Sequence, residues 1–165
     1  MMRIELSVLL AAALTLASCG GTPAPPAAPP AFNPDDPAVT AALDSVVALA
    51  RAGADAVNAE QTLAPLNAED NLTFMSGDIL IAGKAEILKA FQQTYATIKA
   101  QRHAPVARQV RLLAPDVALY SAVAKGTFQD LSGAISDPVG LGTTAIFVRR
   151  DGVWRLAHFH QSVAP

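Results

Sequence analysis

A succession of strand-like segments, separated by turn signals, fills the C-terminal third of the chain and limits the folds open to it. These segments span residues 106–113, 117–128, 139–149 and 154–163. In the first of them apolar and polar residues alternate, as in a half-buried strand. Asp151-Gly152 separates the last two segments and is a strong signal for a short hairpin. Strands joined by such short turns pair antiparallel, so the sequence predicts one antiparallel sheet.

Helices are expected before this sheet. Asp36 and Pro37 form a good helix start, with an acceptor side chain at the cap and a proline at the first helical position. Apolar residues then recur every three or four positions as far as Ala59, which predicts one long helix. A short helical piece, a small hairpin and a second long helix should follow over residues 60–66, 72–81 and 84–100. This order predicts an α+β fold, with the helices packed on one face of a curved antiparallel sheet.

Composition and charge exclude several classes of protein. Hydrophobic residues make up 52% of the chain and charged residues 16%, which is too apolar for an intrinsically disordered protein. Outside the N-terminus no apolar run approaches the ~18 residues that a membrane span needs. The net charge of −2 provides no electrostatic attraction for nucleic acid. We therefore expect a soluble domain without a nucleic-acid partner.

The N-terminus has the pattern of an export signal. An uncharged apolar run from Leu6 to Leu16 leads into Leu16-Ala17-Ser18-Cys19, where small residues precede the only cysteine of the chain. This tetrapeptide resembles the lipobox of bacterial lipoproteins. The resemblance implies that residues 1–18 are removed as a signal peptide and that Cys19 is acylated, which anchors the protein to a membrane of the bacterial envelope. Because Gly20 follows the cysteine, the resemblance favours the outer membrane, facing the periplasm. A secretory signal with an incidental cysteine, or an uncleaved helix, is the alternative.

A proline-rich stretch separates this signal from the rest of the chain. Seven of the sixteen residues from Thr22 to Pro37 are prolines, interleaved with alanine. Such a segment favours an extended polyproline conformation and serves as a semi-rigid spacer. We therefore interpret residues 19–37 as the lipidated cysteine with its linker and residues 38–165 as one domain.

Two segments carry a resemblance to a known superfamily. The last hairpin reads Arg150-Asp151-Gly152-Val153-Trp154-Arg155-Leu156-Ala157-His158-Phe159-His160-Gln161-Ser162, and Gly83-Lys84-Ala85-Glu86 starts the second long helix. Both are similar to segments of the nuclear transport factor 2-like superfamily, in particular its steroid isomerase-like and SnoaL-like members. The resemblance implies a cone-shaped, half-open barrel with a pocket between sheet and helices. Members include isomerases, cyclases, dehydratases and plain binding domains, and many dimerise through the sheet, so a homodimer is expected.

The last strand supplies the main candidates for a functional site. A period of two places Trp154, His158, His160 and Ser162 on one face. If that face lines the cone, one histidine could act as a general acid or base, because imidazole changes charge near neutral pH. The same side chains could instead line a ligand pocket without turnover or satisfy buried backbone groups.

Three more residues are candidates for the same pocket. Asp70 lies where members of the superfamily often carry an acidic residue, although it also reads as part of a solvated loop. Tyr120 and Tyr95 could point their hydroxyl groups into the cavity or pack in the core. Two histidines two residues apart could also chelate a metal, with a third ligand from His103, Asp70 or Glu69. No motif supplies that ligand, so neither a metal nor another cofactor is predicted.

These observations leave three functions open. The first is an envelope lipoprotein whose domain binds a small, largely apolar molecule. The second is a small enzyme of the isomerase, cyclase or dehydratase type that uses a histidine or aspartate for acid–base chemistry. The third is a structural envelope lipoprotein that acts through the outer face of its sheet.

Overall fold

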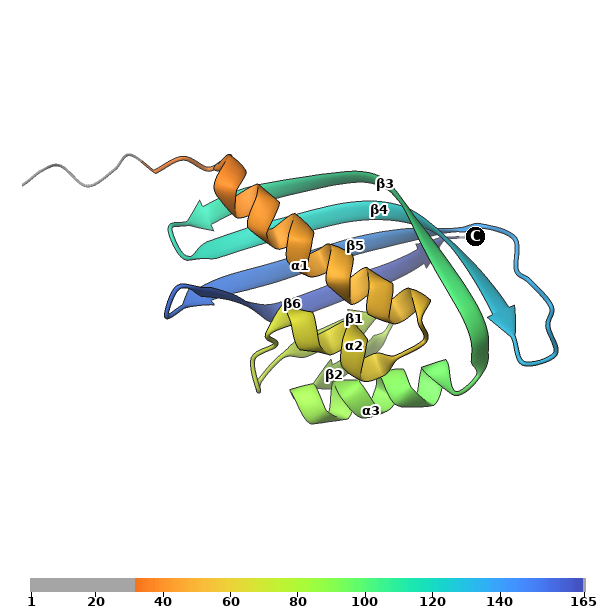
Figure 1. Cartoon of the computed structure of the whole chain (residues 1–165). Helices are drawn as coiled ribbons and strands as arrows, with labels where there is room; N and C mark the ends of the chain where they lie inside the picture. The colour runs from red at the N-terminus through yellow and green to blue at the C-terminus, as the bar shows by residue number, and fades with distance from the viewer. Residues whose placement is uncertain (1–31, 165) are drawn as a thin grey trace, which may run out of the picture. The chain divides into compact units, whose positions relative to one another are not determined.

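The computed structural model describes residues 32–164, in which three helices lie on one face of a six-stranded sheet (Figure 1). The helices are α1 (Pro37–Asp55), α2 (Ala59–Leu63), which continues into a short 3-10 turn (Ala64–Leu66), and α3 (Lys84–Tyr95). The strands are β1 (Thr73–Ser76), β2 (Ile79–Ala82), β3 (Ile98–Ala114), β4 (Val117–Asp130), β5 (Val139–Arg150) and β6 (Val153–Ala164). Within this part of the chain no helix has the length and hydropathy that a bilayer crossing requires. The predicted signal peptide of residues 1–18, Cys19 and most of the predicted linker lie outside the described residues.

The start of helix α1 follows the predicted capping chemistry. Asp36 accepts a hydrogen bond from the backbone N–H of Ala38 at 2.8 Å, and Pro37 occupies the first turn. The helix ends at Asp55 rather than near Ala59, because Asn58 caps a separate helix, α2. Asp55 is therefore the last residue of α1, at the end nearest to α2.

Strand β3 begins earlier than the sequence predicts. The second long helix was expected to reach Ala100, but α3 ends at Tyr95 and β3 already begins at Ile98. Ile98 pairs with Asp130 and Gln101 pairs with Phe128, so pairing with β4 determines the conformation of this stretch. Cross-strand pairing outweighs the weak local preference for helix, as tertiary contacts commonly do. His103 consequently lies on a strand of the sheet.

The sheet has the strand order β2-β1-β6-β5-β4-β3. All neighbouring strands are antiparallel except β1 and β6, which pair in parallel, a departure from the purely antiparallel sheet expected from sequence. The sheet is curved and does not close into a barrel, because β2 and β3 remain its two edges (Figure 1). The predicted α+β fold, with helices on one face of a curved sheet, is confirmed.

The hydrophobic core lies between the sheet and the helices. Its largest fully buried side chains are those of Phe147, Leu43, Leu72, Ile87 and Leu156. Gly53 allows α1 and α2 to approach closely, since a Cβ there would lie 2.3 Å from the backbone carbon of Gln61. This contact brings the end of α1 next to α2 and so positions the polar side chains described below.

Candidate functional site

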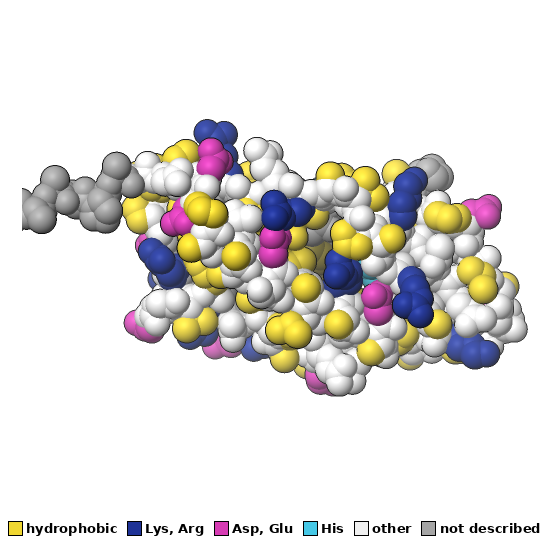
Figure 2. All heavy atoms as spheres, turned by 45° about the horizontal axis from the view of Figure 1, so that its top comes forward, with side chains coloured by type: hydrophobic (Ala, Val, Ile, Leu, Met, Phe, Trp, Pro, Cys, Tyr) yellow, Lys and Arg dark blue, Asp and Glu magenta, His cyan; other side chains and the backbone are white. Residues whose placement is uncertain are grey.

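A cavity of about 620 Å³ lies between the helices and the concave face of the sheet. Side chains of all three helices and all six strands line it, and most of these side chains are apolar. Figure 2 shows the hollow from outside, with hydrophobic side chains in its interior and Lys or Arg side chains at its edge. Its volume lies within the range of about 300–1,000 Å³ that is typical of small-molecule sites.

One wall of the cavity is aromatic. The rings of Phe74 and Phe159 are stacked with centroids 5.2 Å apart, and Phe91 meets Phe74 edge to face at 5.3 Å. Tyr95 continues this series by stacking on Phe91 at 6.0 Å. Contacts of this kind restrict the rings, so the wall is a preformed apolar surface.

A histidine–aspartate pair lies at the polar end of the same cavity. The Nδ1 atom of His103, on β3, is 2.7 Å from the Oδ1 atom of Asp55 at the end of α1. The backbone N–H of His103 donates to the same oxygen at 3.0 Å. The two side chains are only 15% and 28% exposed, so the pair is more strongly coupled than an ion pair on the open surface.

This geometry defines which nitrogen of His103 is free. An ionised carboxylate only accepts hydrogen bonds, so Nδ1 carries the proton that is donated to Asp55. Nε2 has no hydrogen-bond partner within residues 32–164, and His103 lines the cavity. A histidine oriented in this way by a carboxylate is suited to take a proton at Nε2, because the carboxylate stabilises the resulting imidazolium.

Three further polar side chains line the same cavity. The hydroxyl groups of Tyr95 and Thr62 are 3.3 Å apart, and the amide of Gln101 donates to the backbone carbonyl of Ala54 in the last turn of α1. Burial raises the pKa of Tyr95, an effect that hydrogen bonds from Thr62 and Gln101 oppose and the charge of Asp55 reinforces. The Tyr95 hydroxyl therefore keeps its proton at neutral pH and is available as a hydrogen-bond donor in the cavity that His103 also lines.

We predict that both tyrosines of the chain ionise later in the folded protein than in the unfolded chain. Burial is the main cause that raises the pKa of Tyr95 and of Tyr120 above the ordinary value. Because a raised pKa delays phenolate formation, the ultraviolet absorbance of the native protein should change at a higher pH than that of the unfolded chain. A spectrophotometric titration repeated in denaturant should return both groups to about pH 10. Native and unfolded curves that coincide would contradict this burial.

The described domain corresponds to a known protein family. The family model of the SnoaL-like domain matches residues 39–165. The chain belongs to this family. The resemblance seen in the last hairpin and at the start of α3 is thus confirmed.

Solved structures agree with this SnoaL-like fold. A protein with a cystatin-like fold from Caulobacter vibrioides is 20% identical, with 76% of this chain and 89% of that chain covered and a TM-score of 0.66. The hexachlorocyclohexane dehydrochlorinase LinA-type3 from Novosphingobium barchaimii is 16% identical, with coverages of 78% and 88% and a TM-score of 0.68. A ketosteroid isomerase-like protein from Erwinia carotovora atroseptica is also 16% identical, with coverages of 76% and 96% and a TM-score of 0.64. Among curated proteins, none matches the chain.

An extra residue in β6 changes which side chains of this SnoaL-like domain face the cavity. Ile146 of β5 pairs with His158, whereas the next residue, Phe147, pairs with Leu156. Ala157 is therefore left without a partner, as in a β-bulge. Because side chains alternate along a strand, one unpaired residue exchanges the two faces of the strand beyond it.

The predicted placement of the C-terminal histidines in the cavity is wrong for this reason. Beyond the bulge, Phe159 and Gln161 line the cavity. The opposite, outer face carries the residues that were expected inside, namely His158, His160 and Ser162. On that face His158 Nδ1 lies 2.8 Å from the hydroxyl oxygen of Thr73 on the neighbouring strand β1.

The other predicted site residues divide into two groups. Tyr95 and Tyr120 both line the cavity, as expected from sequence. Trp154 is not among the lining residues and packs in the core instead, with the guanidinium carbon of Arg149 5.4 Å from its ring centroid. Asp70 is exposed in the turn before β1 and lies outside the cavity, so its expected place there is wrong.

His103 and Asp55 are the residues that sequence reasoning missed. From sequence, His103 is a candidate only as a metal ligand, and Asp55 is one more polar residue of a predicted helix. One signal was available, because His103 is the only one of the three histidines that lies outside the last strand. Within residues 32–164 no group of three or more His, Cys, Asp or Glu side chains is placed to hold a metal ion.

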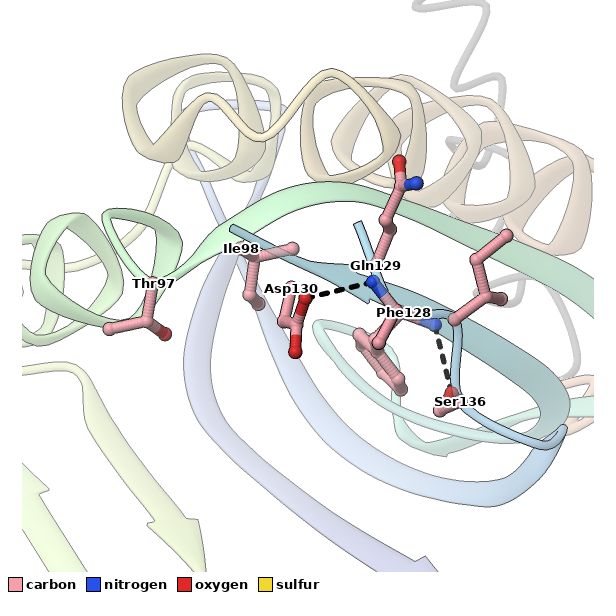
Figure 3. Close-up of a pocket in the computed structure, with 8 residues that line it drawn as sticks. Thr97, Ile98, Phe128, Gln129, Asp130 and Ser136 are labelled. Carbon is pink, nitrogen blue, oxygen red and sulfur yellow. Dashed lines mark hydrogen bonds between the residues drawn. The ribbon is translucent and has the colours of Figure 1, made fainter. Parts of the chain in front are cut away.

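A smaller hollow of about 300 Å³ adjoins the cavity at the start of β3 and the end of β4 (Figure 3). Ile98 and Phe128 line both hollows. The loop after β4 closes its far side, where the backbone N–H of Phe128 donates to the hydroxyl of Ser136 at 3.1 Å. Asp130, the last residue of β4, accepts a hydrogen bond from the hydroxyl of Ser132, which lowers the pKa of the Asp130 carboxyl group. The Asp130 carboxylate therefore stabilises the turn that follows β4.

Proposed function

We propose that this SnoaL-like domain is a small acid–base enzyme that removes a proton from carbon in a small, largely apolar molecule. The observation that carries this proposal is the 2.7 Å contact between His103 Nδ1 and Asp55 Oδ1 at the polar end of an apolar cavity. Positioned bases of this kind contribute about 10²–10⁴-fold to the rate of proton transfer. The reaction class is an isomerisation or an elimination.

Each polar side chain has a role in this reaction. His103 takes the proton at Nε2, and Asp55 holds the imidazole and stabilises its positive charge once it is protonated. The protonated Tyr95 hydroxyl donates a hydrogen bond to the negative charge that develops on the substrate. The aromatic wall of Phe74, Phe91 and Phe159 holds the apolar body of the substrate.

The names of two similar structures support the same reaction class. One is named a dehydrochlorinase and the other ketosteroid isomerase-like, so the first name denotes an elimination and the second an isomerisation. Both proteins share the SnoaL-like fold at low identity, so they support the class of reaction and do not identify a substrate.

The experiment uses nitrobenzisoxazole, a small planar apolar compound that reports on any general base in a cavity. Removal of its ring C–H proton breaks the N–O bond, forms a nitrile and releases a coloured phenolate. We expect saturable turnover by the protein, faster than that of free imidazole at equal concentration, and inhibition by an apolar competitor such as phenylnaphthylamine.

A control variant distinguishes a histidine in the cavity from a histidine on the outer face of the sheet. His160→Gln removes a histidine from the outer face and should leave the rate unchanged. Turnover no faster than that of free imidazole would contradict the proposed catalysis. If the competitor nevertheless binds, the domain is a binding module for small apolar molecules, which is the function first considered from sequence.

We further propose that the domain acts in the bacterial envelope. Acylation at Cys19 would attach it to the outer membrane, on the side that faces the periplasm. The proline-rich linker would hold the domain away from the lipid surface. A homodimer formed through the outer face of the sheet, which carries His158 and His160, completes this proposal. These statements are supported by the sequence pattern of the N-terminus and by the resemblance to dimeric members of the superfamily.

A further inference from the structure

Two side-chain bridges connect helix α1 to strand β3 and frame one wall of the cavity. At one end Arg108 donates to Asp44 at 2.6 Å, and at the other His103 contacts Asp55 at 2.7 Å. Eleven residues of helix and five residues of strand separate these bridges, and both stretches span about 16 Å. The helix and strand are therefore held side by side at two points, with the cavity between them. Figure 2 shows the hollow and the cationic side chains at its edge.

Arg51 lies on α1 between the two bridges. It is partly buried and lines the cavity, one helical turn before Asp55. Within residues 32–164 no carboxylate lies within ion-pair distance of Arg51, whereas Arg108 is paired with Asp44 and Arg150 with Glu69. A partly desolvated cation without a partner is costly unless something else compensates it.

Tyr120 provides a second polar group near this guanidinium. Its side chain lines the cavity and is 6% exposed. Burial raises the pKa of Tyr120, the negative charge of Asp44 reinforces that rise, and the positive charges of Arg108 and Arg51 oppose it, so all three charged groups lie close enough to act on its hydroxyl. The hydroxyl keeps its proton at neutral pH, and the carboxylate beside it, Asp44, is paired with Arg108 and not with Arg51.

We propose that Arg51 binds an anionic group of the ligand, so that the substrate class is an acid with a small apolar body. The guanidinium fork of arginine matches carboxylate and similar anions with two parallel hydrogen bonds, whereas a neutral ligand would leave its positive charge uncompensated. The apolar body occupies the cavity, and the anionic group lies at the guanidinium of Arg51. This inference rests on the proposed function, because it assumes that the cavity takes a small apolar molecule.

A pair of fluorescent probes tests whether the cavity prefers a ligand with a negative charge. Anilinonaphthalene sulfonate and phenylnaphthylamine share one apolar body, and only the first carries an anionic group. We expect the protein to bind the sulfonate more tightly. In Arg51→Gln the affinity for the sulfonate should fall about tenfold, the size expected for loss of a hydrogen bond between charged groups. The affinity for phenylnaphthylamine should not change.

Two further variants serve as controls. Arg51→Lys keeps the charge and should retain part of the preference for the sulfonate. Arg111→Gln removes a cation from the exposed outer face of β3 and should change neither affinity. Circular dichroism of each variant verifies that the fold is intact, since a loosened core binds such dyes unspecifically.

The outcomes distinguish this inference from the proposed function. An unchanged ratio of the two affinities in Arg51→Gln overturns the assignment of an anionic ligand, while binding of phenylnaphthylamine still supports an apolar ligand cavity. Failure of both probes to bind the unaltered protein overturns the ligand cavity and this inference together.

Discussion

Replacing His103 with glutamine is expected to lower the rate of proton abstraction from nitrobenzisoxazole by about 10²–10⁴-fold. Glutamine can fill much of the space of the imidazole and can still donate to Asp55, but it cannot take up a proton at neutral pH. The loss should appear in kcat, because the apolar walls that bind the probe remain in place. Initial rates measured by phenolate absorbance, with His160→Gln as the matched histidine control, provide the measurement.

A second variant shows whether the two side chains act as a unit. Asp55→Asn removes the negative charge that stabilises the protonated imidazole and should also lower kcat, by less than the histidine replacement. The double variant should be no slower than His103→Gln alone, because the carboxylate acts only through the histidine. Full activity in His103→Gln would remove His103 from its proposed role, and additive losses would mean that Asp55 acts separately.

Replacing Phe147 with alanine is expected to lower the free energy of unfolding by about 3–5 kcal/mol. The side chain is 0% exposed, lies on β5 between the sheet and the helices, and contacts the ring of Tyr120 edge to face. Its loss removes buried apolar area and leaves a void that joins the existing cavity. A loss of this size is a large fraction of the stability of an ordinary domain.

Urea unfolding followed by circular dichroism measures this effect. Phe32→Ala is the matched control, because Phe32 is 50% exposed and its replacement should change the free energy of unfolding by no more than about 0.5 kcal/mol. Equal losses in the two variants would mean that Phe147 is not a central part of the core.

Local patterns were sufficient to predict most of the elements. The acceptor side chain of Asp36 and the proline after it predicted the start of α1 at the observed residue. The Asp151-Gly152 turn predicted the hairpin of β5 and β6, where both residues have the positive φ angles that such a turn requires. These features depend on residues that are close together in the chain, so they can be predicted from the sequence alone. The end of α3 was placed wrongly because pairing with β4, a distant segment, determines the conformation from Ile98 onward.

The candidate site was harder to predict, for a geometric reason. Strand alternation correctly grouped His158 with His160, but the choice of face depended on a single unpaired residue, Ala157. A bulge leaves no clear mark in the sequence, and because the side-chain period is two, it moves every later residue to the opposite face.

The sequence by itself therefore determined the family, the order of helices and strands and the capped start of α1. Only the tertiary structure decided which residues meet in the cavity. Asp55 and His103 are 48 residues apart and come together because α1 packs along β3. Their contact depends on how α1 lies on the sheet, and local periodicity contains no information about that packing.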